Sequence, residues 1–371
     1  MIWLDIIDPK YVLFFKELLP LLQTEFLITT RSSPNYQETR ALLDLYHMPY
    51  LCFGGRGESL EQKYIERLKR SHWFLKLFNK KRPDLLLVGA SVEAVQSAFA
   101  LQIPIAYFLD TPSLGSKPNA KQTIMPPTKL AKLSAPLADV IFAPFVVPLK
   151  AYKLAGVQEV IFYPFIDPVL WLKKPNTELD FRKVCGLNCK RPTLLLRQEE
   201  QAHYVSNPTT LFDASILALN ELDVNLVILP RYSAKPLKKA FSHLKNVFIL
   251  EQKFSATDLY AHSDIMLGGG GTMNLESCYY GLPTLSLRSL WLYHDHYLLK
   301  HQLMAHATTV IEVLHFVKNA LLPYENQDIN ITRKNIQAKN HAKAKKFFIK
   351  GAINFDFLFK APLLAKYFNS P

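Results

Sequence analysis

The residues with the clearest chemical signature are four consecutive glycines that follow a short apolar run. They are Gly268, Gly269, Gly270 and Gly271. Glycine lets the backbone approach a ligand closely, and Thr272 is suited to cap a helix that follows. The free amides and the dipole at such a helix N-terminus favour an anion such as a diphosphate. Glu276, about one turn further on, can then reach a pair of ribose hydroxyls. The alternative is a glycine-rich turn without a ligand.

Arginines follow two other apolar runs in the same half of the chain. One run ends at Arg197, and another is followed closely by Arg231. A guanidinium group is planar, always charged and suited to two-point contact with a phosphate. Arg197 is therefore a candidate phosphate ligand, and His203 and Tyr204 are weaker candidates in the same loop. Arg231 has two equally open interpretations: it lies near the nucleobase or phosphates of a bound nucleotide, or it is exposed on the surface.

Polar residues also follow the apolar runs of the N-terminal half, namely Asp8, Ser91 and Asp110. In a doubly wound sheet, ligands bind beyond the carboxyl ends of the strands. A carboxylate at that edge can act as a general base, which makes Asp110 the first candidate and Asp8 the second. Each of the two fits equally well as the cap of the turn or helix that follows. Arg31 fits either an acidic substrate or a surface ion pair.

Two further motifs each allow more than one interpretation. The glycine-rich turn of residues 52–58 contains Arg56 and can wrap a phosphate or carboxylate, or it is a surface loop. The histidines at 294, 296 and 301 resemble metal ligands. On a helix, His294 and His301 share a face while His296 points elsewhere, which disfavours a metal site. Contact with a sugar or acceptor, or an exposed polar helix, remain the two interpretations.

The elements that must position these residues are short apolar runs alternating with helical patterns, which indicates parallel α/β layers. The N-terminal half has such runs at 2–7, 25–29, 85–88, 105–109 and 140–142. Prolines at 164, 168 and 175 interrupt the pattern. It restarts with runs at 193–196, 224–229, 247–250, 265–267 and 283–287. At roughly 150 residues per domain, a chain of 371 residues corresponds to about two domains.

We therefore predict an N-terminal Rossmann-like domain over 1–168 and a second one over 176–330. The remaining segment, 331–371, differs in composition. Residues 333–350 hold seven Lys and Arg and no acid, and an aromatic-rich end follows. We expect this segment to be helical and to cross back to the N-terminal domain.

The overall composition describes a folded, basic protein. Hydrophobic residues make up 49% of the chain, and 44 Lys and Arg against 31 Asp and Glu give a formal net charge of +13. This charge suits phosphate-rich partners. Residues 63–82 read as a basic amphipathic helix, either lying on an anionic membrane or packing its apolar stripe on the sheet. No nucleic-acid-binding signature accompanies the charge, which makes nucleic acid an improbable partner.

Targeting and redox signals point to a cytoplasmic protein. Association with the inner face of the membrane is left open. The N-terminus carries no basic region of the kind a secretory signal has, and the longest clean apolar run, 140–149, is far short of a membrane span. The four cysteines are too few and too scattered for a disulfide framework.

The glycine segment with Asp264, Thr272 and Glu276 resembles the nucleotide-diphosphate-sugar site of the GT-B superfamily. That superfamily includes the UDP-N-acetylglucosamine 2-epimerases and the N-acetylglucosaminyltransferase of peptidoglycan synthesis. A closer resemblance covers residue 1 to about 310. Its matches are Trp3 to Ile6, Pro9-Lys10, Phe14-Phe15, Thr29 to Arg31, Pro83-Asp84, Ser91, the turn from Leu101 to Pro104, Asp110, Arg197 and Gly268 to Thr272. On these residues the chain is similar to an archaeal and bacterial family known as domain of unknown function 354.

The resemblance implies two Rossmann-like domains facing each other across a cleft. It places the diphosphate of a nucleotide sugar, such as a UDP-sugar, on the glycines, the ribose on Glu276 and the donor phosphates near Arg197. An unknown acceptor would lie on the N-terminal domain. A glycosyltransferase is the first expectation, a non-hydrolysing 2-epimerase the second, and a non-catalytic nucleotide-sugar-binding protein the third. The acids and histidine that the 2-epimerases use have no residue-by-residue match in this chain. GT-B enzymes generally need no bound catalytic metal, so the resemblance implies no metal site and no required cofactor.

Overall fold

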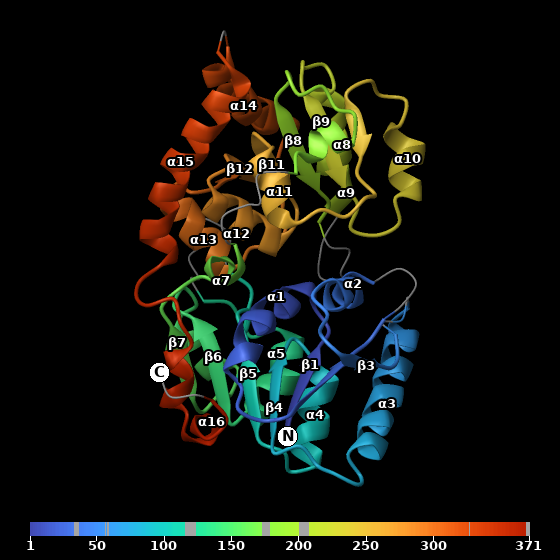
Figure 1. Ribbon diagram of the computed structural model, residues 1–371, viewed down its shortest axis with the longest axis vertical. Helices are drawn as coiled ribbons and strands as arrows, with labels where there is room; N and C mark the ends of the chain where they lie inside the picture. The colour runs from blue at the N-terminus through green and yellow to red at the C-terminus, as the bar shows by residue number, and fades with distance from the viewer. Residues whose placement is uncertain are drawn as a thin grey trace. The chain divides into compact units, whose positions relative to one another are not determined.

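The structure is a computed structural model that describes residues 1–32, 37–55, 57, 59–115, 124–172, 179–199, 208–325 and 327–368. The chain forms two compact units, Met1–Trp171 with Gly351–Pro371, and Leu172–Lys350. Each unit contains one sheet covered by helices (Figure 1). Neighbouring strands run parallel in both sheets, so the predicted pair of parallel α/β units is confirmed.

The first unit has a seven-stranded sheet. In spatial order its strands are β3 (Tyr50–Cys52), β2 (Phe26–Thr30), β1 (Ile2–Ile6), β4 (Leu85–Gly89), β5 (Ile105–Phe108), β6 (Val140–Pro144) and β7 (Val160–Tyr163). Its helices are α1 (Pro9–Leu18), α2 (Glu38–Leu45), α3 (Leu60–Leu77), α4 (Val92–Ala100), α5 (Lys129–Ser134), α6 (Leu149–Leu154), α7 (Pro168–Trp171) and α16 (Pro362–Ala365).

The second unit has a six-stranded sheet. In spatial order its strands are β10 (Val247–Ile249), β9 (Asn225–Leu229), β8 (Thr193–Arg197), β11 (Ile265–Gly268), β12 (Thr284–Ser286) and β13 (Ala305–His306). Its helices are α8 (Phe181–Val184), α9 (Pro208–Leu219), α10 (Lys235–Phe241), α11 (Ala256–Ala261), α12 (Gly271–Tyr280), α13 (Tyr293–Lys300), α14 (Val310–Leu321) and α15 (Ile329–Phe348).

The strands that the sequence did not predict are β3, β7 and β13, and all three lie at an edge of their sheet. An edge strand is covered on fewer sides than a central one. Residues of β3 and β13 are accordingly half-exposed or exposed, and in β7 buried residues alternate with half-buried ones. The central strands β1, β4 and β9 are buried along their whole length. A continuous apolar run therefore marks the central strands best, and β10 is the edge strand that such a run also marks.

The basic C-terminal segment is divided between the two units. Helix α15 belongs to the second unit and packs on α12. Arg333 of α15 makes a two-point ion pair with buried Asp264, at 2.8 and 3.0 Å. The aromatic residues that follow belong to the first unit, where the Phe355 ring meets that of Phe14 and the Phe357 ring meets that of Phe142.

Gly281 caps the C-terminus of helix α12, and the packing of α15 requires glycine there. Gly281 has φ +104°, and a Cβ there would lie 2.2 Å from the carbonyl oxygen of Gln337. We expect Gly281→Ala to lower the free energy of unfolding by about 2–4 kcal/mol, because backbone strain adds to overpacking against backbone atoms. Urea unfolding measures this. Gly186→Ala is the matched control, since Gly186 also has a positive φ, +69°, but no atom within 4 Å of a Cβ. Equal losses in both variants would show that the close approach contributes nothing.

Candidate functional site

The carboxyl ends of four parallel strands of the second unit meet at one edge of its sheet. In the register of these strands, Arg197 at the end of β8 lies between Gly268 of β11 and Leu229 of β9, and Gly268 lies beside Ser286 of β12. The residues that follow these strands therefore converge. This is the edge at which open α/β sheets bind ligands.

The glycine turn passes from this edge into helix α12. The helix begins at Gly271, its N-cap is Gly270, and no side-chain hydrogen bond caps it among the described residues. The expectation that Thr272 caps the helix is wrong, because Thr272 already lies in the first turn. The turn needs glycine at Gly269, where a Cβ would lie 2.3 Å from the backbone nitrogen of Glu199. The first-turn amides of α12 carry the partial positive charge that attracts an anion.

Three arginine side chains surround the glycine turn. A Cβ placed on Gly270 would lie 3.1 Å from Nη2 of Arg231 and 3.5 Å from Cγ of Arg197, and one on Gly271 would lie 3.2 Å from Nη1 of Arg288. Each arginine follows or ends a different strand. Together with the helix N-terminus they make this turn a concentrated positive site, suited to a diphosphate.

Contacts with the backbone and with an acid hold Arg197 and Arg288 in place. Arg197 donates through Nη1 to the carbonyl oxygens of Leu229 and Pro230, at 3.3 and 2.7 Å. Arg288 donates through Nη1 to Asp295 at 3.0 Å. The loop after Arg288 is fixed in turn, because its next backbone amide, of Ser289, donates to the Glu199 carboxylate at 3.0 and 3.1 Å. Arg197 and Arg288 are therefore held beside the glycine turn by contacts within the second unit itself.

Glu276 lies on α12 beside this turn and is almost fully buried. Its carboxylate accepts a 2.8 Å hydrogen bond from the hydroxyl of Tyr260 on α11. Burial, and then the negative charge of Glu276, raise the pKa of Tyr260 well above its usual value, so the hydroxyl keeps its proton and donates. The ribose contact expected from the sequence stays a prediction. The structure adds that Glu276 is the hydrogen-bond acceptor for the buried Tyr260 hydroxyl.

In the first unit, Asp8 and Ser91 are helix caps. Asp8 accepts from the backbone amide of Lys10 at 2.9 Å and caps α1. Ser91 accepts from the amide of Ala94 at 3.4 Å, caps α4 and is fully buried. Of the two interpretations open for Asp8, the cap is the one that the structure displays. A substrate contact by either side chain stays a prediction.

Asp110 is joined to a buried lysine. Lys10 Nζ lies 2.5 Å from the Asp110 carboxylate and also pairs with Asp167. Burial by itself would lower the pKa of Lys10, but the carboxylates of Asp110 and Asp167 outweigh it and the pKa is raised. Lys10 therefore stays charged. The Asp110 carboxylate is thus engaged in an ion pair, and it must leave that pair before it can act as a general base.

A second buried charge network joins α3, α4 and the strands β1 and β2. Arg70 donates to Asp5 at 2.6 Å and to Glu93 at 2.7 Å, and all three side chains are buried. Arg31 reaches the same Glu93 at 2.9 Å. Arg31 is thus in a partly buried ion pair, and not in the surface pair that the sequence allowed. Thr29 completes the network by donating to Asp5 at 2.5 Å.

Some expected site residues lie outside the described part of the chain, namely Arg56, His203 and Tyr204. The histidine-rich stretch forms α13. Across the described ranges, no group of three or more His, Cys, Asp or Glu is placed to hold a metal ion. Sequence reasoning missed Arg288 and the anchoring role of Glu199. Arg288 directly follows the predicted strand 283–287, so the strand-end rule used for Arg197 would have found it.

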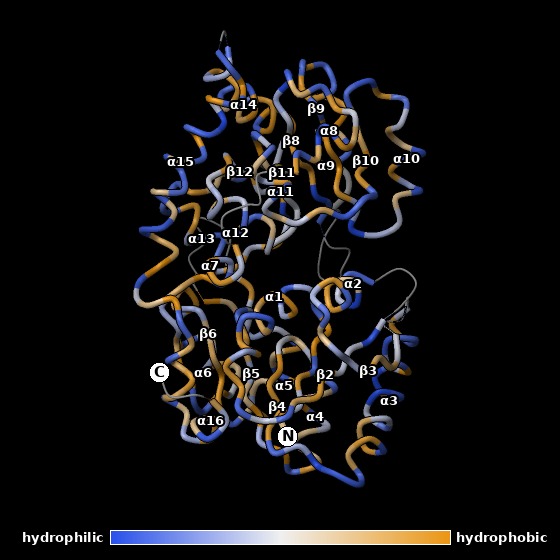
Figure 2. Tube along the Cα trace, in the orientation of Figure 1, coloured by the Kyte–Doolittle hydropathy of each residue, from blue (hydrophilic) through white to orange (hydrophobic). Residues whose placement is uncertain are grey.

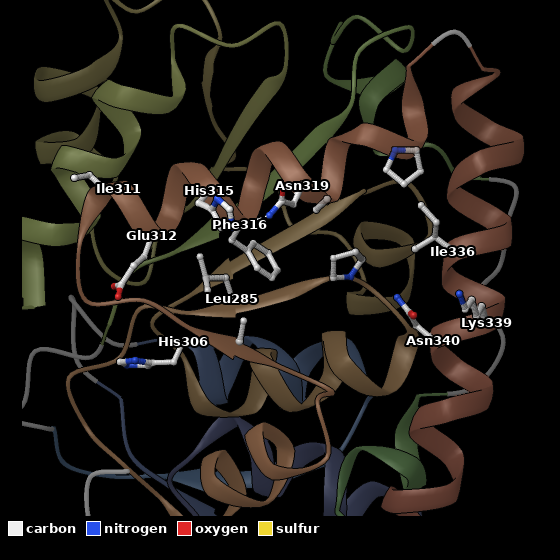
Figure 3. A pocket seen from close by; sticks show the side chains of 14 residues that line it. Leu285, His306, Ile311, Glu312, His315, Phe316, Asn319, Ile336, Lys339 and Asn340 are labelled. Atoms are coloured by element: carbon white, nitrogen blue, oxygen red, sulfur yellow. Dashed lines mark hydrogen bonds between the residues drawn. The ribbon is translucent and has the colours of Figure 1, made fainter. Parts of the chain in front are cut away.

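A groove of about 740 Å³ lies elsewhere in the second unit, along β12, α14 and α15. Figure 3 shows Phe316 and Leu285 in its middle, His306 at one end and Lys339 at the other. None of the four glycines lines it. His306 nevertheless connects the two places, since its Nε2 lies 2.9 Å from the carbonyl oxygen of Arg288.

Comparison with solved structures shows the fold. The UDP-GlcNAc 2-epimerase of Methanocaldococcus jannaschii, solved with UDP-GlcNAc and UDP, superposes with a TM-score of 0.67 at 14% identity, covering 92% of this chain and 99% of that one. The Neisseria meningitidis UDP-GlcNAc 2-epimerase, bound to UDP-GlcNAc, superposes with a TM-score of 0.64 at 17% identity, covering 93% of this chain and 98% of that one. Anabaena HepE with UDP-glucose superposes with a TM-score of 0.59 at 14% identity, covering 94% of this chain and 95% of that one. The fold is therefore GT-B-like.

Comparison of sequences shows the family. The uncharacterised protein MJ0665 of Methanocaldococcus jannaschii is 26% identical over 333 residues, which are 86% of this chain and 91% of that protein. Residues 1–336 match the family described as "Protein of unknown function (DUF354)". That match spans both parallel sheets and the glycine turn with its three arginines, so this chain belongs to the DUF354 family.

Proposed function

We propose that the second unit binds a nucleotide-diphosphate sugar and that the protein is a glycosyltransferase using that donor. The single observation that carries the proposal is the glycine turn at the start of α12 with Arg197, Arg231 and Arg288 around it. Among metabolites with two adjacent phosphates, a UDP-sugar is favoured by the solved GT-B-like structures, several of which contain UDP or a UDP-sugar.

The proposed chemistry follows from where charge develops. In glycosyl transfer the bond between the sugar and the diphosphate breaks, and the leaving diphosphate gains negative charge. Fixed guanidinium groups and helix amides stabilise this charge more strongly than the bound ground state, which lowers the barrier. The acceptor oxygen forms the new bond to the sugar carbon while its hydroxyl proton passes to a carboxylate, for which Asp110 remains the candidate. Its pairing with Lys10 makes release from that ion pair part of the proposal.

Non-hydrolysing epimerisation at the sugar is the second candidate, because UDP-GlcNAc 2-epimerases are among the solved structures that share this fold. The contacts of four acids of the first unit weigh against it. Asp5 of β1 and Glu93 of α4 are held by Arg70, Asp8 caps a helix and Asp110 is paired with Lys10. Removing a proton from carbon and returning one needs more than one positioned acid–base group, so epimerisation requires the release of more of these contacts than transfer, which needs Asp110.

The binding part of the proposal is tested by arginine substitution. We expect Arg231→Ala and Arg288→Ala each to weaken UDP binding roughly tenfold to a hundredfold, because each removes a charged hydrogen-bond donor from the phosphates. Isothermal titration with UDP measures this. Arg191→Ala is the control, since Arg191 is a half-exposed arginine of the same unit whose ion pair is with exposed Asp223. Equal affinity in all three variants would place the anion site elsewhere.

The reaction is tested by following UDP-sugars over time in the presence of the purified protein. Release of UDP that depends on added acceptor supports transfer. An NMR spectrum in which the sugar signals convert to those of the C2 epimer, with the diphosphate still attached, supports epimerisation. UDP binding without either change leaves a binding protein and contradicts both reactions.

A further inference from the structure

Helix α3 of the first unit exposes a stripe of large apolar side chains. Leu60, Tyr64, Leu68 and Leu75 are 72, 61, 53 and 51% exposed. Spacings of four, four and seven residues place them on one face of the helix. Ile65, which is also exposed, widens the stripe. Figure 1 shows α3 on the outer side of its unit next to the edge strand β3, and Figure 2 shows hydrophobic and hydrophilic residues alternating along it.

The stripe is not the face by which α3 packs on its unit. The buried side chains of α3 are Arg70 and Phe74, which contact Asp5 and Trp3 of β1, and Phe78 is buried just beyond the helix end. The sequence-based alternative, in which Ile65, Leu68, Leu75 and Phe78 pack on the sheet, is therefore wrong for the first three, which are exposed, and holds for Phe78. Because α3 packs on its unit through the face with Arg70 and Phe74, the opposite apolar face is accessible to another surface. Exposed apolar stripes of this kind mark interaction sites.

The charges around the stripe select the kind of surface. Residues 60–82 hold eight Lys and Arg against two Glu. Of the two glutamates, Glu66 accepts from the Gly55 amide and from Lys69, so its charge is already compensated. The exposed lysines Lys69 and Lys76 border the stripe on one side. A second copy of this face would bring lysines against lysines, whereas an anionic surface complements them.

We propose that α3 docks the first unit onto an anionic membrane surface. The stripe enters the boundary between headgroups and acyl chains, while the bordering lysines meet the phosphates of anionic lipids. This is peripheral contact: among the helices of the described residues, none is long and apolar enough to cross a membrane. The proposal concerns the first unit alone, so it stands or fails independently of nucleotide-sugar binding by the second.

Vesicle flotation of the full chain tests the proposal. The probes are vesicles of pure phosphatidylcholine and vesicles of equal parts phosphatidylcholine and phosphatidylglycerol. We expect the protein to float with the anionic vesicles only, and the binding to disappear at about 1 M salt, where charges are screened within about 3 Å. Joint replacement Leu68→Glu and Leu75→Glu should reduce the bound fraction at least tenfold, because it puts two carboxylates against anionic lipid. Lys76→Glu alone should reduce it about fivefold or more.

The matched control replaces two comparably exposed leucines of the same unit, Leu149→Glu and Leu154→Glu on α6. It should bind vesicles as the unmodified protein does, and circular dichroism should show both double variants folded. Equal binding by the α3 variant, or equal binding to neutral and anionic vesicles, overturns the proposal. So does a dimer, seen by light scattering without vesicles, that the α3 variant abolishes, because the stripe is then an interface between two copies of the chain.

Discussion

Replacing Arg70 by methionine is expected to lower the free energy of unfolding by about 3–5 kcal/mol, a large fraction of the stability of a typical domain. Arg70 is fully buried and neutralises both Asp5 and Glu93 through bonds of 2.6–2.7 Å. Methionine fills similar volume but leaves Asp5 buried with its charge uncompensated and Glu93 with Arg31 alone. Guanidinium unfolding followed by circular dichroism measures the loss.

A lysine on the same helix provides the control for Arg70. Lys69 makes a 2.8 Å ion pair with Glu66, and its side chain is 57% exposed. Solvent screens such a pair, so Lys69→Met should cost less than about 1 kcal/mol. If Arg70→Met costs no more than Lys69→Met, water reaches the network and the two acids are solvated without the arginine.

The same network predicts how stability depends on pH. Burial alone would raise the pKa of Glu93, but Arg31 and Arg70 outweigh burial and hold it below its ordinary value. A carboxyl group with a lowered folded pKa stabilises the protein above its unfolded pKa of about 4.3, and this contribution is lost as pH falls through the folded value. Unfolding curves should therefore show stability falling below pH of about 4, and the fall should be smaller in Arg70→Met. A parallel fall in both proteins would assign the pH dependence to other carboxyl groups.

Replacing Glu276 by alanine is expected to weaken UDP binding by about 1.5–3 kcal/mol, which is roughly tenfold to over a hundredfold. The reason is the loss of a charged acceptor for the ribose hydroxyls, placed on α12 beside the glycine turn. Isothermal titration with UDP measures the change. Titration with inorganic diphosphate, which has no ribose, should show little difference between the two proteins.

The structure alters what else this substitution does. The sequence alone predicts that Glu276→Ala leaves the fold stable, because a residue that contacts a ligand is not part of the core. Glu276 is instead buried and accepts from the Tyr260 hydroxyl at 2.8 Å. We therefore expect Glu276→Ala to lower the free energy of unfolding by about 1–3 kcal/mol, since a buried hydroxyl loses its partner. The variant Tyr260→Phe with Glu276→Ala removes that hydroxyl and should recover part of the stability without recovering affinity. Unchanged affinity for UDP in Glu276→Ala would remove Glu276 from the site.

The sequence by itself determined the class of the fold and predicted the turn at which we propose the anion site. Central strands of parallel sheets are covered on both faces, so their residues form continuous apolar runs that can be read without a structure. The residues that end or follow these runs, such as Arg197 and the glycines, were thereby assigned to the carboxyl edge where ligands bind. Thr272 was misjudged as a cap because helix α12 begins at Gly271, and the start of a helix depends on backbone geometry that a glycine run leaves open.

Only the tertiary structure decided which charged residues meet. Arg288, Arg231 and Arg197 converge on one turn because four strands distant in sequence lie in register, and spacing along the chain carries no record of that register. The pairing of Lys10 with Asp110 spans a hundred residues for the same reason. In α3, both faces of the helix carry apolar and basic residues, so periodicity could not tell which face is buried. The acids Asp5 and Glu93 decided it, because a buried carboxylate requires a cation and Arg70 is the residue of α3 that supplies it.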